Sequence, residues 1–96
     1  MEIIVRIANQ GALEEREYTN QQTGMTEKFA SMPFVLQHGT DTIHAEMIQE
    51  QARKQGVLDP NYYYLATLNF KAQPVKTKDG GEFVKNNVTL TKIALL

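Results

Sequence analysis

Apolar and polar residues alternate along five stretches of this chain, and a period of two is the pattern of β-strands that bury one face. The stretches are Glu2–Ala8, Lys28–His38, Thr42–Met47, Tyr62–Lys71 and Phe83–Leu95. We expect the inward, apolar faces of these strands to form the core. Their residues are Ile3, Val5, Ile7, Ala30, Met32, Phe34, Leu36, Ile43, Ala45, Met47, Tyr62, Tyr64, Ala66, Leu68, Phe70, Val88 and Leu90.

The segment after the first strand has two interpretations. Gly11 lacks a Cβ and is a natural position for a bend or bulge. Ala12–Tyr18 then either resumes the strand or forms a helical turn, because its Leu-Glu-Glu-Arg-Glu sequence has good helix propensity. We favour the strand. Thr19–Thr26 is polar and contains a glycine, which predicts a hairpin tip. Pro33 has no N–H for a ladder, so the second strand should place it at an edge or bulge.

One short helix is predicted between the third and fourth strands. Glu46–Gln55 is rich in helix formers, and Glu50 precedes Lys54 by four residues, the favourable order for an ion pair. Gly56 is placed to end the helix in the left-handed conformation. The packing side should consist of Met47, Ile48 and Ala52.

Turn-forming residues separate the strands. His38–Asp41 predicts a tight turn, and Asp59-Pro60-Asn61 predicts another before the fourth strand. Gln73–Gly81 contains a proline, two lysines and Asp79-Gly80-Gly81, so we expect a polar connection there.

The predicted order is therefore three strands, one helix and two more strands, in a single domain of residues 1–96. This order favours a mainly β fold, namely a five-stranded OB-like Greek-key barrel with one short helix between strands 3 and 4. Other small β-barrels share several of these elements. The position of the helix is the most specific indication of the OB-fold, which often binds single-stranded nucleic acid.

Composition narrows the function classes. Ten Lys and Arg against eleven Asp and Glu give a net charge of −1, which counts against a generic polyanion binder. The absence of cysteine excludes a disulfide scaffold and suits a reducing, cytoplasmic location. No apolar run approaches the roughly 20 residues of a membrane span, and the N-terminus lacks the pattern of a secretory signal. We therefore expect no association with a membrane.

Several segments resemble one family. They are Met1–Ile7, the hairpin Thr23–Phe29, Leu58–Tyr63 leading into a strand that ends near Phe70, and the closing Leu90–Ile93. In their spacing and residue types they resemble the small single-stranded-DNA-binding proteins of filamentous phages and related mobile elements, which are dimeric OB-fold proteins.

This resemblance implies a homodimer in which the hairpin after the first strand contacts the nucleic-acid backbone and aromatic side chains stack on bases. The residues in the corresponding part of this chain are Arg16, Tyr18, Lys28 and Phe29. This hairpin differs from the family in one respect. Where the family tends to be basic, it carries Glu14, Glu15, Glu17 and Glu27.

Aromatic residues interleaved with cations are the residue types that single-strand binders use, because each stacked base contributes about 1–3 kcal/mol and the cations contact phosphates. The candidate stacking platforms are Tyr18, Phe29 and Tyr63. The candidate phosphate contacts are Arg6, Arg16, Lys28, Lys71, Lys76 and Lys78. Two alternatives stay open: Tyr63 suits a protein interface equally well, and Lys76 and Lys78, beside Asp79, are also consistent with a solvated loop.

Little in the sequence supports a catalytic function. His38, Asp41, His44 and Glu46 are close in sequence, but their spacing matches no strong metal-ligand motif, and such residues are more often solvated turn residues. The His44-Ala45-Glu46 fragment lacks the cysteine ligands of a zinc deaminase. We expect a protein that is not an enzyme and that holds neither metal nor cofactor.

Two functions remain. The first is non-catalytic binding of single-stranded DNA, with RNA as the alternative ligand, to coat the strand during replication or transfer. The second is a protein-interaction or assembly module on the same barrel that binds its partner through an exposed sheet edge. The nearly neutral charge and the four hairpin glutamates favour the second.

Overall fold

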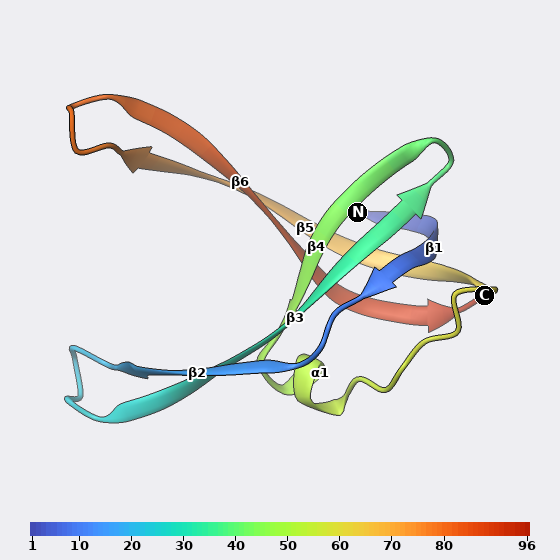
Figure 1. The fold of residues 1–96 in the computed structure, drawn as a ribbon, viewed down its shortest axis with the longest axis horizontal. Helices are drawn as coiled ribbons and strands as arrows, with labels where there is room; N and C mark the ends of the chain where they lie inside the picture. Colours follow the sequence, from blue (N-terminus) through green and yellow to red (C-terminus); the bar gives the residue numbers. More distant parts are fainter.

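The computed structural model describes residues 1–96 and is mainly β, with six strands and one short helix (Figure 1). In chain order the elements are β1 (Glu2–Gln10), β2 (Glu14–Thr19), β3 (Thr26–His38), β4 (Asp41–Ile48), α1 (Gln49–Lys54), β5 (Tyr63–Lys76) and β6 (Glu82–Leu95). The predicted mainly β class and the single short helix are confirmed. The strand count is six rather than five, because the predicted continuation of the first strand forms β2, a separate strand.

All six strands belong to one sheet in the order β1-β5-β6-β4-β3-β2. In addition β1 pairs with β3, so the pairings run from β1 through β5, β6, β4 and β3 and return to β1. Every pairing is antiparallel except that of β4 with β6, which is parallel and brings Glu46 opposite Thr89. β2 pairs only with β3 and forms the free edge of the sheet.

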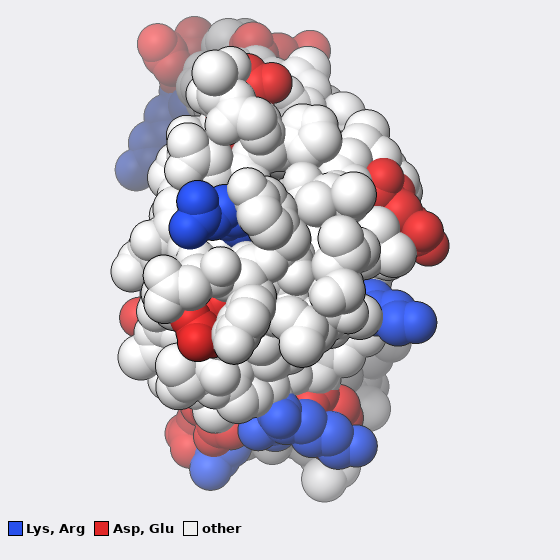
Figure 2. All heavy atoms as spheres, turned by 90° about the vertical axis from the view of Figure 1, so that its right-hand side faces the viewer, with Lys and Arg blue, Asp and Glu red and all other residues white.

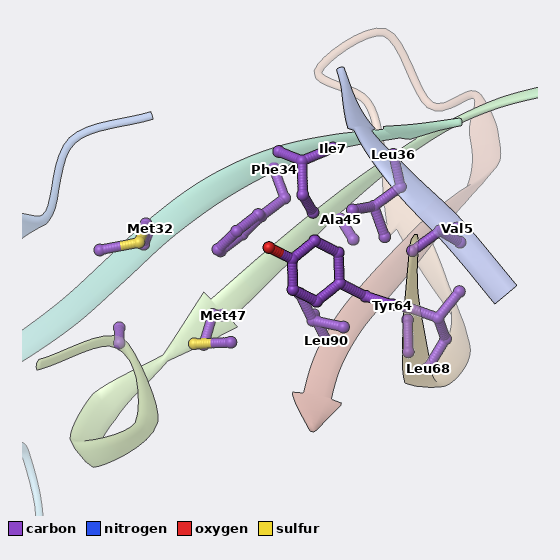
Figure 3. Close-up of a cluster of buried hydrophobic side chains, with 12 residues drawn as sticks. Val5, Ile7, Met32, Phe34, Leu36, Ala45, Met47, Tyr64, Leu68 and Leu90 are labelled. Atoms are coloured by element: carbon purple, nitrogen blue, oxygen red, sulfur yellow. The ribbon is translucent and has the colours of Figure 1, made fainter. Parts of the chain in front are cut away.

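The core lies where the five mutually paired strands face one another, and Figure 3 shows its side chains pointing together. Its twelve buried residues are Val5, Ile7, Met32, Phe34, Leu36, Ala45, Met47, Ala52, Tyr64, Ala66, Leu68 and Leu90. Ile3, Ile43 and Val88 pack against them, and Ala30 is fully buried as well. The Tyr64 hydroxyl donates a hydrogen bond to the Asp59 carbonyl (3.0 Å), so the buried ring keeps a partner for its polar end.

The prediction of burial is wrong for two of the expected core residues. Tyr62 is 54% exposed because it lies in the bend before β5 begins, outside the alternating strand. Phe70 is 49% exposed although it continues the face of Leu68. The pairing of β5 with β1 ends at Thr67, and beyond it β5 pairs with β6 alone, so no second layer covers Phe70.

Two hairpins extend from this body toward the left of Figure 1. We call residues 14–31, which are β2 with the paired part of β3, the first arm, and residues 69–89 of β5 and β6 the second arm. The hairpin tip predicted at Thr19–Thr26 is confirmed, since β2 ends at Thr19 and β3 begins at Thr26.

The polar connection predicted over Gln73–Gly81 is wrong for Gln73–Lys76, which are strand, whereas the turn predicted at Asp79-Gly80-Gly81 is confirmed. β5 runs on to Lys76, and the turn is closed by a hydrogen bond from the Thr77 N–H to the Gly81 carbonyl (2.8 Å). Pro74 is tolerated because this part of β5 has a free edge, where a missing N–H breaks no ladder.

The first arm starts at a sharp junction. Pairing of β1 with β3 ends at Gln10, and pairing of β2 with β3 begins at Glu14. Between them the Gly11 N–H donates to the Pro33 carbonyl (2.8 Å). N–H and C=O of one strand residue point to the same side, so the missing N–H of Pro33 faces this interruption of the ladder. The chain bends at Gly11 as predicted. Pro33 lies at the gap between the β1 and β2 pairings of β3 rather than at a bulge, since the register shift of the β1–β3 ladder falls between Ile7 and Asn9.

The helix is shorter than predicted. Glu46–Ile48 continue β4, and α1 has six residues, so no helix in this protein could span a bilayer. Gly56 does not adopt the left-handed conformation, because the helix already ends at Gln55 in extended backbone. Glu50 pairs with Arg53 rather than with Lys54.

Candidate functional site

A groove of about 550 Å³ lies between the two arms, across the outward face of β4. It is the largest concavity of the protein and is lined by side chains or backbone of Phe29, Pro33, His44, Ala45, Glu46, Ile48, Asn69, Lys71, Gln73, Lys85, Asn86, Asn87, Val88 and Thr89. Four of the six strands contribute, so the groove exists only in the folded chain.

The second arm forms a polar wall of this groove. Directly paired residues of an antiparallel ladder share a face, and the pairs here are Asn69 with Thr89, Lys71 with Asn87, and Gln73 with Lys85. The wall therefore carries two lysines on a diagonal, about 7–8 Å apart at their Cα atoms, interspersed with carboxamides. The Asn87 amide donates a long hydrogen bond to Gln73 Oε1 (3.4 Å).

The floor is the outward face of β4. Ala45 and Met47 point into the core, so the alternation turns His44, Glu46 and Ile48 outward. Glu46 stands between the two walls, since its backbone pairs with Pro33 of β3 on one side and with Thr89 of β6 on the other.

The first arm contributes the groove's aromatic wall. Phe29 is half-buried and lines the groove, and its ladder partner Arg16 lies on the same face of the arm. The next pair on this face is Tyr18 with Glu27, whose side chains are joined by a hydrogen bond from the Tyr18 hydroxyl to Glu27 Oε2 (2.7 Å). That bond to a carboxylate raises the pKa of Tyr18 above its usual value, because the phenolate would lose the bond and face a negative charge.

Helix α1 holds the first arm in position. Arg53 forms ion pairs with Glu50 (2.8 Å) and with Glu15 of the arm (3.2 Å), and these partners raise the pKa of its guanidinium. It also reaches the Lys28 carbonyl (3.4 Å). The Gln49 side chain accepts a hydrogen bond from the Ala30 N–H (3.2 Å). These contacts attach α1 to the arm at Glu15 and at the backbone on both sides of Phe29.

The predicted site residues separate into several places. Phe29 and Lys71 lie in the groove, and Arg16 and Tyr18 share the Phe29 face of the first arm. Lys28 is on the opposite face of that arm, paired with Glu17. Lys76 is the last residue of β5 and Lys78 is in the turn, so both lie at the tip of the second arm.

Arg6 and Tyr63 lie apart from the groove. They are ladder partners on β1 and β5, and the Arg6 guanidinium stands 5.5 Å from the centre of the Tyr63 ring, a cation–π contact. Together with Ile4, Gln37 and Gly39 they line a smaller depression. The predicted platforms and cations therefore do not form one continuous surface.

Sequence reasoning missed most of the groove's polar side chains, namely His44, Asn69, Gln73, Lys85 and Asn87. The predicted connection over Gln73–Gly81 concealed the long hairpin that brings β5 and β6 together there. A usable signal was present in the alternation itself: Lys85, Asn87 and Thr89 occupy every second position of the last strand.

Charge differs in sign between the two arms. The first arm has four glutamates against Arg16 and Lys28, a net charge of −2. The second arm has four lysines against Asp79 and Glu82, a net charge of +2. Figure 2 shows the end of the molecule away from the arms, where uncharged atoms cover most of the centre and charged side chains of both signs gather at the lower edge.

His38, Asp41, His44 and Glu46 do not assemble into a metal site. His38 Nδ1 lies 2.8 Å from the Ile4 carbonyl, and no group of three or more His, Cys, Asp or Glu side chains comes together anywhere in the protein.

No family model, curated protein or solved structure matches this chain. Function must therefore be inferred from the chemistry of the groove and its two arms.

Proposed function

We propose that the protein is an OB-fold domain that binds single-stranded nucleic acid, DNA in the first place, in the groove between its arms. If β1 and β2 are counted as one strand bent at Gly11, the chain has five strands whose pairings return to the first, with the helix between the third and fourth. This order supports the assignment to the OB-fold, a five-stranded Greek-key barrel. The OB-fold binds oligonucleotides across its second and third strands and the loops that here correspond to the two arms.

The observation that carries the proposal is the composition of the groove. Phe29 offers a ring on one wall, and Lys71 and Lys85 offer cations on the other. A single strand that runs between the arms could stack a base on the ring and place phosphates at the lysines, the combination on which single-strand binders depend. The protein acts without catalysis by coating the strand, in replication or in transfer of a mobile element, and homodimerisation remains a prediction.

Binding should be weak and only moderately dependent on salt. Two groove lysines predict a slope of log K against log salt of about −1.4, because each phosphate neutralised on a single strand contributes about −0.7. The Glu46 carboxylate at the floor and the acidic first arm oppose a polyanion and lower the affinity further.

The test is a fluorescence-anisotropy titration with labelled single-stranded DNA across a salt series. Replacing Lys71 and Lys85 together by alanine should abolish the salt dependence and most of the binding. The matched control replaces Lys54 and Lys92, which lie outside the groove, and removes the same charge. Equal loss of binding in both double variants would show general electrostatic attraction instead of a groove.

A second pair of variants distinguishes Phe29 from Tyr63, two of the three candidate platforms. Phe29→Leu should weaken binding by about 1–3 kcal/mol, the contribution of one stacked base, whereas Tyr63→Leu should leave it unchanged. Failure of the wild type to bind at micromolar protein and low salt would refute nucleic-acid binding altogether.

The alternative is a protein-interaction module, and the first arm favours it. That arm has a net charge of −2, and β2 exposes an unpaired edge to which a partner strand could add. A stable complex with a protein partner, formed by a preparation that carries no nucleic acid, would support this function over the first.

A further inference from the structure

The groove combines three features that stacking and phosphate binding do not require. Asn69, Gln73 and Asn87 present carboxamides from one face of the second arm, and the only hydrogen bond among them is the long one from Asn87 to Gln73. Glu46 places a carboxylate at the floor of a site proposed for a polyanion, and none of the protein's three ion pairs uses it. Phe29 is the one phenylalanine or tyrosine in the groove.

From these features we infer that the groove selects bases by their edges and prefers cytosine and adenine to thymine and uracil. The inference rests on the proposed function, because it assigns a base preference to the same groove. Binders without sequence preference depend on successive aromatic platforms, whereas selective recognition of single strands uses hydrogen bonds to exposed base edges. A groove with more carboxamides than rings fits the second kind.

The paired residues of the second arm have the chemistry to contact both the phosphate and the base of a nucleotide. Lys71 lies opposite Asn87, and Gln73 lies opposite Lys85, so each ladder pair combines a cation with a carboxamide. The cation meets a phosphate, and the carboxamide, with a donor and an acceptor side by side, meets a base edge. Consecutive pairs on one face of a strand are about 6.8 Å apart, so the two pairs present the same chemistry twice along the groove.

Glu46 decides which bases fit. A carboxylate only accepts hydrogen bonds, so it takes the exocyclic amino group of cytosine N4 or adenine N6 and repels the carbonyl oxygen at the same place in thymine or uracil. The carboxamides match both preferred bases, because each has a ring-nitrogen acceptor beside its amino donor. Thr89 lies opposite Glu46 in the β4–β6 pairing, and Asn87 is two residues before it on the same face, which places the carboxylate next to the amide wall.

The experiment compares oligodeoxycytidylate with oligodeoxyuridylate of equal length at low salt, because the two bases differ only at the N3–C4 edge. Wild-type protein should bind the cytidine oligomer at least about 5-fold more tightly, the lower end of what one well-placed edge contact discriminates. Oligodeoxyadenylate should also bind more tightly than oligothymidylate.

Glu46→Gln tests the assigned role. Glutamine carries a donor as well as an acceptor, so this variant should bind the uridine oligomer more tightly and lose the preference. Glu2→Gln removes the same charge from β1, outside the groove, and should keep the preference. Thermal melts of both variants verify that they fold.

The outcomes separate the two hypotheses. Equal affinity of wild-type protein for the cytidine and uridine oligomers, or a preference that survives Glu46→Gln, overturns the inference and leaves the proposed function standing. Absence of binding to all four oligomers overturns both.

Discussion

Adding one methyl group at Gly11 should destabilise the protein more than any other glycine-to-alanine change in the chain. A Cβ there would lie 2.4 Å from Pro33 Cγ, 3.0 Å from Cδ and 3.2 Å from the Pro33 carbonyl oxygen. Carbon atoms in contact prefer about 3.5–4.0 Å. The proline ring is fixed to the β3 backbone, so the two segments must separate by roughly 1 Å.

The cost of Gly11→Ala follows from that separation. Overpacking of this kind costs about 1–3 kcal/mol. Loss of the bond from the Gly11 N–H to the Pro33 carbonyl adds about 0.5–1.5 kcal/mol. The total of about 1.5–4.5 kcal/mol is a large part of the 5–15 kcal/mol that typically stabilises a domain. In a chain of this size it should lower the melting temperature by on the order of 10–25 °C.

Two further variants make this reasoning refutable by denaturant melts. At Gly56 an added Cβ meets nothing within 4 Å and the backbone is not left-handed, so Gly56→Ala should be neutral or stabilise by about 0.4–1 kcal/mol. Pro33→Ala removes Cγ and Cδ, so Gly11→Ala should cost less in that background. If Gly11→Ala melts like the wild type, close contact between residue 11 and Pro33 does not limit the bend. The same conclusion follows if Gly11→Ala lowers stability as much in the Pro33→Ala background as in the wild type.

Three other predictions concern the core, the first arm and its support. Leu90→Ala, at a fully buried position, should lower the free energy of unfolding by about 2–5 kcal/mol in a denaturant melt. Leu95→Ala, at a side chain that is 64% exposed, should change it by less than about 0.5 kcal/mol. Similar costs for the two variants would contradict the described core. The hydrogen bond from Tyr18 to Glu27 should stabilise the protein below the ordinary tyrosine pKa of about 10, and this stabilisation should be lost as pH rises through the raised pKa of Tyr18. Glu27→Gln should therefore lower the pKa of Tyr18 in an ultraviolet titration. An unchanged tyrosine titration would rule the bond out. Arg53→Ala should change global stability little, as is usual for exposed ion pairs, yet it should accelerate amide hydrogen exchange in the first arm and not in the second. Equal acceleration in both arms would argue against a local support.

The alternation of residue types was sufficient to identify the strands and most of the core. Val5, Phe34 and Leu36 are buried as their alternation predicts, because a strand paired on both sides can bury a face only at every second residue. The bend at Gly11 was also predictable, since a residue without a Cβ at the end of an alternating stretch is typical of a bend or bulge.

The same pattern was not sufficient where pairing extends beyond the core. Phe70 belongs to an apolar alternation and is nevertheless half exposed, because burial requires a second layer and the sequence does not say where that layer ends. Polar residues such as Gln73 and Lys85 look like loop residues in one dimension. They form a ladder because β5 and β6 continue pairing with each other after the other strands have stopped.

The sequence by itself determined a mainly β chain with one short helix, since both the period of two and its interruption after β4 are local properties. Only the tertiary structure decided that Phe29 faces Lys71 and Lys85 across Glu46, and that Tyr63 pairs with Arg6 elsewhere. These residues are far apart in the chain. Their proximity depends on strand register and on the length of the two hairpins. Long-range pairing sets both, and neither produces a periodic pattern in the sequence.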